Sequence, residues 1–160
     1  MKLFVTGVAG QLGHDVMNEL NKRGYEGVGS DLAPEYSGIQ DSTAVTTMPY
    51  ISVDITDASA VEKAITEAGV DGVVHCAAWT AVDAAEDEDK QEIVRKVNVL
   101  GTENIAKVCK KLGIKMMYLS TDYVFDGQGT TPWEPDCKAY KPLNAVSYTH
   151  LRAHETDSYL

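Results

Sequence analysis

Three glycines near the start of the chain have the spacing of a phosphate-binding turn. Gly7, Gly10 and Gly13 follow the apolar run at residues 3–5, and a helical pattern begins directly after them. Gly7 tolerates the backbone angles of a sharp turn, Gly10 lets a pyrophosphate approach bare backbone, and Gly13 lets the helix pack closely on the strand. Because the free N–H groups at the helix start then face the phosphates, the pattern predicts a dinucleotide-binding βαβ unit.

Two carboxylates stand where strands of such a unit would end. Asp31 lies 18 residues beyond the last of these glycines, after a predicted strand at 25–30, and suits bidentate contact with the adenosine ribose hydroxyls. It would also repel a 2′-phosphate, which favours NAD over NADP. Asp54 and Ile55 would stand at the end of the next strand, within reach of adenine. The alternatives are a solvated loop aspartate at 31 and, after the third strand, a simple helix cap at Thr56 or Asp57.

Small and polar residues follow two later strands. Residues 77–83 form a small-residue turn after the apolar stretch 70–77, and Ser120 and Thr121 leave the end of the next strand. Ligands bind at the carboxyl edge of doubly wound sheets, so these hydroxyls would face the nicotinamide. His75 lies inside the apolar stretch, where a neutral core histidine is more common than a catalytic base, and we expect the core role.

The elements that position these residues alternate between strands and helices, which predicts an α/β fold with a Rossmann-type doubly wound parallel sheet. Loops with prolines and glycines are expected at 32–50 and at 126–143, the second lying over the cleft. Asn98 and Gly101 interrupt the apolar stripe of the longest helix, and a buried asparagine there needs partners. The predicted strands cover 3–5, 25–30, 51–54, 70–77 and 114–119, and the predicted helices 11–22, 58–68 and 84–112.

The composition excludes several classes of function. The chain has 160 residues, with 24 Asp and Glu against 14 Lys and Arg and a net charge of −10, which argues against nucleic-acid binding. The three cysteines lie far apart, so neither a disulfide framework nor a metal site is expected, and their odd number fits a reducing cytoplasm. The apolar runs are too short to span a membrane.

Four strings resemble the extended short-chain dehydrogenase/reductases and, within them, the family of dTDP-4-dehydrorhamnose reductases. They read VTGVAGQLG, HCAAWTAVDAAEDE, VNVLGTENIA and STDYVFDG, and the similarity covers residues 1–144. The resemblance implies an NAD(P)-binding domain over 1–144, truncated before the substrate domain. It also implies NAD(P)H as cofactor, reduction of the 4-keto group of a nucleotide-sugar, and leaves a homodimer open.

The resemblance also assigns roles by position. Thr121 would hydrogen-bond the substrate carbonyl as the catalytic hydroxyl, and Tyr123 would contact the substrate. The cofactor contacts would come from Gly7, Gly10, Gln11, Leu12, Gly13, Asp31, Asp54, Ile55, Ala77, Ala78 and Trp79.

The chain departs from this family where a Tyr-x-x-x-Lys pair supplies the proton. The two positions fall on Val146 and His150. Tyr148 and Arg152 have the right spacing but are shifted by two residues, which on a helix rotates the phenol by about 200°, away from the cleft. Residues 145–160 resemble a translated sequencing adapter. We therefore expect a non-native tail that fails to pack, and a chain that is inactive alone.

Two other functions stay open at this point. The regulatory subunit of methionine adenosyltransferase is similar to the same subgroup, binds NADP and serves as a partner protein. A sugar-nucleotide epimerase shares the fold, although GQLG and STDYVFDG fit it less well.

Overall fold

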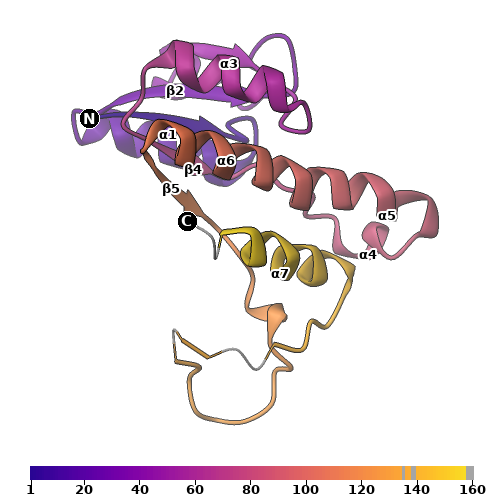
Figure 1. The fold of residues 1–160 in the computed structure, drawn as a ribbon. Helices are drawn as coiled ribbons and strands as arrows, with labels where there is room; N and C mark the ends of the chain where they lie inside the picture. The colour runs from indigo at the N-terminus through magenta and orange to yellow at the C-terminus, as the bar shows by residue number, and fades with distance from the viewer. Residues whose placement is uncertain (135, 138–139, 158–160) are drawn as a thin grey trace.

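The sheet of this protein has five parallel strands in the order β3-β2-β1-β4-β5 (Figure 1). The computed structural model describes residues 1–157 apart from 135 and 138–139, and only the backbone of 154–157. The order reverses between β1 and β4, which is the predicted doubly wound arrangement. The strands are β1 Lys2–Thr6, β2 Glu26–Asp31, β3 Tyr50–Ser52, β4 Gly72–His75 and β5 Lys115–Tyr118.

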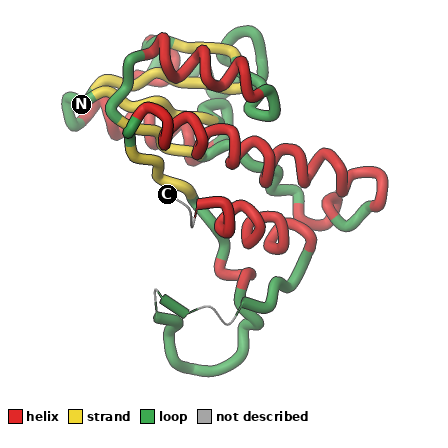
Figure 2. Tube along the Cα trace, in the orientation of Figure 1, coloured by secondary structure: helices red, strands yellow, loops and turns green. Residues whose placement is uncertain are grey.

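Helices lie against the sheet and extend beyond it (Figure 2). None of the described helices is long and apolar enough to cross a membrane. The α-helices are α1 Gln11–Lys22, α2 Ala44–Thr47, α3 Ala58–Ala68, α4 Val82–Ala85, α5 Glu88–Arg95, α6 Thr102–Leu112 and α7 Ala145–Asp157. Two further segments are helical with a different pitch: η1 Lys96–Gly101 is a wider π-helix, and η2 Asp122–Val124 is a tighter 3-10 helix.

Both faces of the central strand β1 are buried, as the alternation of its side chains shows. Phe4 belongs to a core cluster with residues of α3 and α6, whereas the next residue, Val5, belongs to a second cluster with residues of α1. Both side chains are almost fully buried. Since neighbouring side chains of a strand point to opposite faces, each face has its own core.

The first and third helices begin and end where the sequence predicts. The Asp57 carboxylate accepts hydrogen bonds from the backbone N–H groups of Ser59 and Ala60, at 2.9 and 3.1 Å, and so caps α3. Gly69 ends the same helix in the left-handed conformation, at φ +58°. The sequence did not predict the short α2, inside the expected loop 32–50.

The helix expected over 84–112 is wrong as one continuous α-helix. It is divided into α4, α5, the π-helical η1 and α6. The wider turn shifts the phase of the buried face, and along this segment Ile93 and Leu100 are exposed. Val94 and Asn98 are buried instead. The polar Asn98 side chain tolerates burial because it has hydrogen-bond partners there.

The tail was expected not to pack, and this expectation is wrong for the described residues. Asn144 caps α7: its Oδ1 accepts from Ser147 N at 2.8 Å, and Ser147 Oγ accepts from Asn144 N at 3.0 Å. Val146 and Ala153 are buried, and α7 packs against η1 and α6 (Figure 1). A local helix cap and a small apolar face are sufficient for α7 to pack against the rest of the domain, whether or not its sequence is native.

The loop between β5 and α7 does not lie over the cleft. It projects away from the sheet (Figure 1), and none of its described residues between 126 and 143 lines the cavity at the carboxyl edge of the sheet. Phe125 stacks on Trp133, with ring centroids 4.7 Å apart, which holds the loop together from within.

Candidate functional site

A cavity of about 810 Å³ lies at the carboxyl edge of the sheet. The glycine turn, the ends of β2, β4 and β5, the segment after β3, and one side of α7 form its wall. Eleven residues of the predicted site line it: Gly7, Gly10, Gln11, Leu12, Gly13, Asp31, Asp54, Ile55, Ala77, Ala78 and Thr121. The structure therefore brings together residues that are far apart in the sequence.

The three glycines of the turn differ in what a side chain would meet at each position. Gly7 has φ +73°, and a Cβ on it would lie 2.7 Å from the backbone nitrogen of Ala77, so β1 and β4 approach too closely for a side chain. A Cβ on Gly13 would overlap the Gly7 carbonyl. A Cβ on Gly10 would meet only the Gly7 carbonyl oxygen, at 3.4 Å. The fold alone would thus tolerate a side chain at position 10. The bare backbone of Gly10 lines the cavity, as a bound pyrophosphate requires.

The Asp31 carboxylate holds the glycine turn to the end of β2. Its Oδ2 accepts a hydrogen bond from Ala9 N at 3.0 Å, and its Oδ1 accepts from Leu32 N at 2.8 Å. Each oxygen keeps a further lone pair that can accept from a ribose hydroxyl. The residue can therefore order the turn and bind a diol at the same time.

The end of the cavity beside the segment after β3, where the sequence predicts the adenosine, has an apolar wall with a polar rim. Val53 and Ile55 line it, and Gly101 of η1 packs so closely on Ile55 that a Cβ there would lie 2.6 Å from Ile55 Cδ1. Asp54 Oδ1 accepts from the backbone N–H and the hydroxyl of Thr56, at 2.9 and 2.7 Å. These contacts fix the Asp54 carboxylate at the rim.

His75 is a neutral core histidine, as expected. Thr6 Oγ1 accepts from the N–H groups of residues 76–77, so its own proton goes to His75 Nδ1, 2.7 Å away. Thr102 Oγ1 donates to the Asn98 carbonyl at 2.8 Å, so it accepts from His75 Nε2 at 3.1 Å. The proton therefore sits on Nε2. Burial, and then the nearby His150, lower the pKa of His75 to about 4.

Asn98 braces the turn that follows β4. Its Oδ1 accepts from Trp79 N at 2.7 Å, and its Nδ2 donates to Trp79 O at 3.3 Å and to Thr149 Oγ1 at 3.0 Å. One buried amide thus joins η1, the turn and α7. The Trp79 ring packs against a small core that includes Val146, and Trp79 is not among the residues that line the cavity.

The end of β5 supplies the hydroxyls. Ser120 and Thr121 line the cavity, and Thr121 Oγ1 accepts from Tyr123 N at 3.3 Å, which caps η2. Tyr123 is half exposed and does not reach the cavity. The structure therefore places one of the two residues assigned to the substrate at the site and leaves the other outside it.

α7 closes the cavity with residues that the sequence reasoning did not include in the site. Val146 and His150 line it, and His150 Nδ1 is hydrogen-bonded to the Tyr118 hydroxyl at 2.8 Å, while burial lowers the pKa of His150. Tyr148 is exposed, as expected from its shifted position. The signal was available, because the resemblance had already placed the expected proton-donating pair on Val146 and His150.

A parallel sheet in this order, with a glycine turn facing a cavity at its carboxyl edge, defines a Rossmann-type α/β domain. The sequence profile of the RmlD substrate-binding domain matches residues 1–156, and the chain belongs to this family.

Relatives and solved structures agree with this membership. The chain is 38% identical over 133 residues to a dTDP-4-dehydrorhamnose reductase of Streptomyces griseus, covering 83% of the chain and 37% of that protein. A reductase of this name from Clostridium acetobutylicum superposes with a TM-score of 0.80 at 31% identity, over 100% of the chain and 50% of that structure. The one from Bacillus anthracis, solved with NADP, gives 0.80 at 27% identity, over 99% and 49%. The chain thus spans about 40% of curated relatives and half of these structures.

Proposed function

We propose that this chain is the cofactor-binding part of an NAD(P)H-dependent reductase that acts on the 4-keto group of dTDP-4-dehydrorhamnose. The observation that carries the proposal is a single cavity that extends from the bare backbone of Gly10 to the hydroxyl of Thr121. Its one end suits a pyrophosphate and a ribose, and its other end suits a carbonyl to be reduced. Family membership and the named relatives support the same activity.

Different residues along the cavity contact different parts of the cofactor and the substrate. The N–H groups at the start of α1 face the phosphates, and the Asp31 carboxylate accepts from the adenosine ribose. Bound NAD(P)H would supply the hydride. The Thr121 hydroxyl donates to the substrate carbonyl oxygen and stabilises the negative charge that develops on it.

We further propose that the chain alone has no useful turnover. Reduction needs a proton for the forming alkoxide, and general acid catalysis contributes about 10²–10⁴ in rate. The side chains that line the cavity at the two critical positions are Val146, which has no proton to give, and His150, which is hydrogen-bonded to Tyr118. We propose that native sequence ends near Asn144 and that a longer natural protein continues with a Tyr-x-x-x-Lys pair.

Two measurements test the proposal. Fluorescence titration of the chain with NADH and NADPH should show binding, and absorbance of NADH with the keto-sugar present should show no turnover. A continuation that carries Tyr at 146, Lys at 150 and a sugar-binding half should restore turnover, and Thr121→Val in that protein should reduce it with little change in cofactor affinity. Rapid turnover by the chain as given would contradict the argument.

A non-catalytic dinucleotide-binding subunit is the second candidate. Such a subunit needs no proton donor, so it is favoured if α7 is native sequence, because Val146 then stands at the place of the donor. An extended protein that binds NADPH and a partner subunit but does not reduce the keto-sugar would support this alternative.

A further inference from the structure

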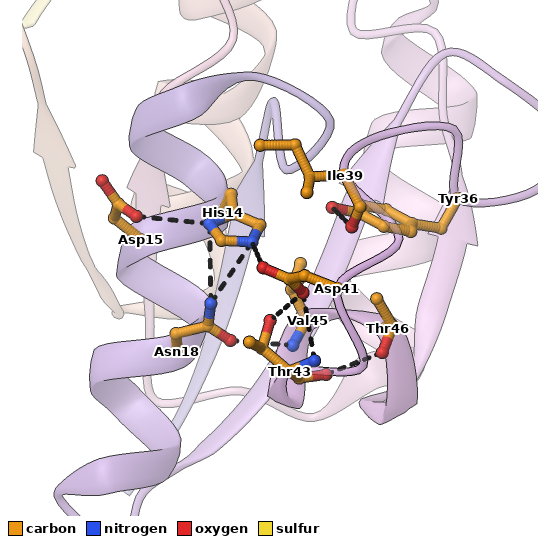
Figure 3. Close-up of polar contacts among 9 residues, drawn as sticks. All are labelled: His14, Asp15, Asn18, Tyr36, Ile39, Asp41, Thr43, Val45 and Thr46. Atoms are coloured by element: carbon orange, nitrogen blue, oxygen red, sulfur yellow. Dashed lines mark hydrogen bonds and ion pairs between the residues drawn. The ribbon is translucent and has the colours of Figure 1, made fainter.

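A histidine on α1 lies between two carboxylates, one of which belongs to the loop after β2 (Figure 3). His14 Nε2 is 3.0 Å from Asp41 Oδ2, and His14 Nδ1 is 3.2 Å from Asp15 Oδ1. The His14 side chain is only 12% exposed. The Asn18 amide nitrogen lies 3.4 and 3.5 Å from the same ring nitrogens, so the carboxylate contacts are the shorter ones.

The two shorter contacts, each to a carboxylate oxygen, favour the charged imidazole over the neutral one. A neutral ring donates from one nitrogen only, so the lone pair of the other nitrogen would face a carboxylate oxygen. The imidazolium donates from both. Hydrogen bonds to Asp15 and then to Asp41 raise the pKa of His14, and partial burial opposes them. These two carboxylates are the charged groups that face the ring from α1 and from the loop.

Hydrogen bonds within the loop orient the Asp41 carboxylate toward His14. Its Oδ1 accepts from the backbone N–H and the hydroxyl of Thr43, at 3.0 and 2.6 Å, which leaves Oδ2 directed at His14 (Figure 3). Asn18 Oδ1 accepts from Val45 N at 3.0 Å one turn further along α1. The segment after β2 therefore meets one face of α1 at two points, Asp41 in the loop and Val45 in α2, of which only the His14 contact depends on pH.

The two segments joined by His14 are both walls of the adenosine end of the cavity. Asp15 and the first turn of α1 form one wall, and Asp31 and Leu32, where the loop begins, form the other. The carboxylates of Asp15, Asp31 and Asp54 line this cavity, and Asp41 stands behind it on His14, whereas a dinucleotide is itself an anion. A cation at His14 offsets their repulsion of the phosphates and also closes the wall.

We propose that His14 is a proton-dependent latch that, when charged, fastens residues 32–43 to α1 and thereby strengthens dinucleotide binding at the adjoining site. The inference rests on the proposed cofactor function. By linkage, a cofactor that favours the latched form must raise the proton affinity of His14, so NADH binding near neutral pH takes up protons. The affinity then falls as pH rises through the range in which histidine loses its charge.

Calorimetry of the intact chain tests the latch without any activity assay. NADH is titrated at about pH 6 and about pH 8, and near neutrality in two buffers of different ionisation enthalpy. We expect the affinity to fall roughly two- to fivefold between the two pH values, the effect of one exposed ion pair, with net proton uptake on binding. His14→Gln, which cannot charge, should lose both the slope and the uptake.

Asp41→Asn is the matched control, because it keeps the shape of the loop side chain and removes its charge. It should reduce the slope, and NMR titration of the His14 ring should show its pKa falling toward the usual value. Binding of NADH with the same pH slope in wild type and His14→Gln, or with no proton uptake, would overturn the latch and leave the cofactor site intact. Failure to bind NADH at any pH would overturn both proposals.

Discussion

Replacing Gly10 should separate cofactor binding from folding. The Cβ of Gly10→Ala would meet only the Gly7 carbonyl oxygen, at 3.4 Å, and otherwise enters the cavity. We expect the loss of stability to stay within about 1 kcal/mol, the cost of alanine at an N-cap. A methyl group where a phosphate must approach backbone costs about 1–3 kcal/mol of binding, or roughly 5- to 150-fold in Kd. Gly10→Val should abolish binding.

Gly13→Ala is the contrasting variant. Its Cβ would overlap the Gly7 carbonyl, so the turn or α1 must move. We expect a loss of about 1–3 kcal/mol, and for a chain of this size a fall in Tm of about 2–4 °C per kcal/mol. Thermal melts followed by circular dichroism and NADH titration by fluorescence give both quantities for each variant. Equal NADH affinity in Gly10→Ala and wild type would refute the placement of the pyrophosphate on this backbone.

Three further outcomes are expected. Asp31→Asn should weaken NADH more than NADPH, measured by parallel titrations, because the ribose diol loses its charged acceptor; equal losses would remove that assignment. Asn98→Leu should cost about 1–3 kcal/mol in urea unfolding, because Trp79 N and O lose their buried partner; a neutral effect would show that water replaces the amide. The pKa of His75 is about 4 in the folded chain against a usual 6.5, so the unfolded chain binds more protons between these pH values. The free energy of unfolding should therefore fall by about 3 kcal/mol as pH drops from 6.5 to 4. NMR titration of the His75 ring, with no transition above pH 5, checks the assignment.

The sequence predicted the parts of this fold whose determinants are local. The helices at 11–22 and 58–68 follow from apolar spacing with Asp57 and Gly69 at the ends of the second. The glycine turn, Asp31 and Thr121 could be placed because each follows a strand, and parallel strands end at one edge of a sheet. The neutral state of His75 followed from its apolar neighbours alone.

The errors concern features that depend on distant partners. The π-helical η1 could not be read from spacing, because its buried face includes Asn98, which is stabilised there by Trp79 and Thr149. Likewise the docking of α7 depends on the small core around Ala85 and Val94, which is not visible in the tail itself. The sequence indicated that a buried Asn98 needs partners, but it could not identify them or the change of helix pitch that brings them together.

The π-helical turn η1 also restricts how the length of this chain can vary. A π-helical turn contains one residue more than an α-helical path, and each residue of an α-helix turns the chain by about 100°. A single deletion within 96–101 could therefore be absorbed as regular α-helix, with unchanged helix content, but Asn98 and Thr102 would no longer face Trp79 and His75 together. Insertions and deletions should accumulate instead in the projecting loop near residues 126–134, which has no part in the cavity wall.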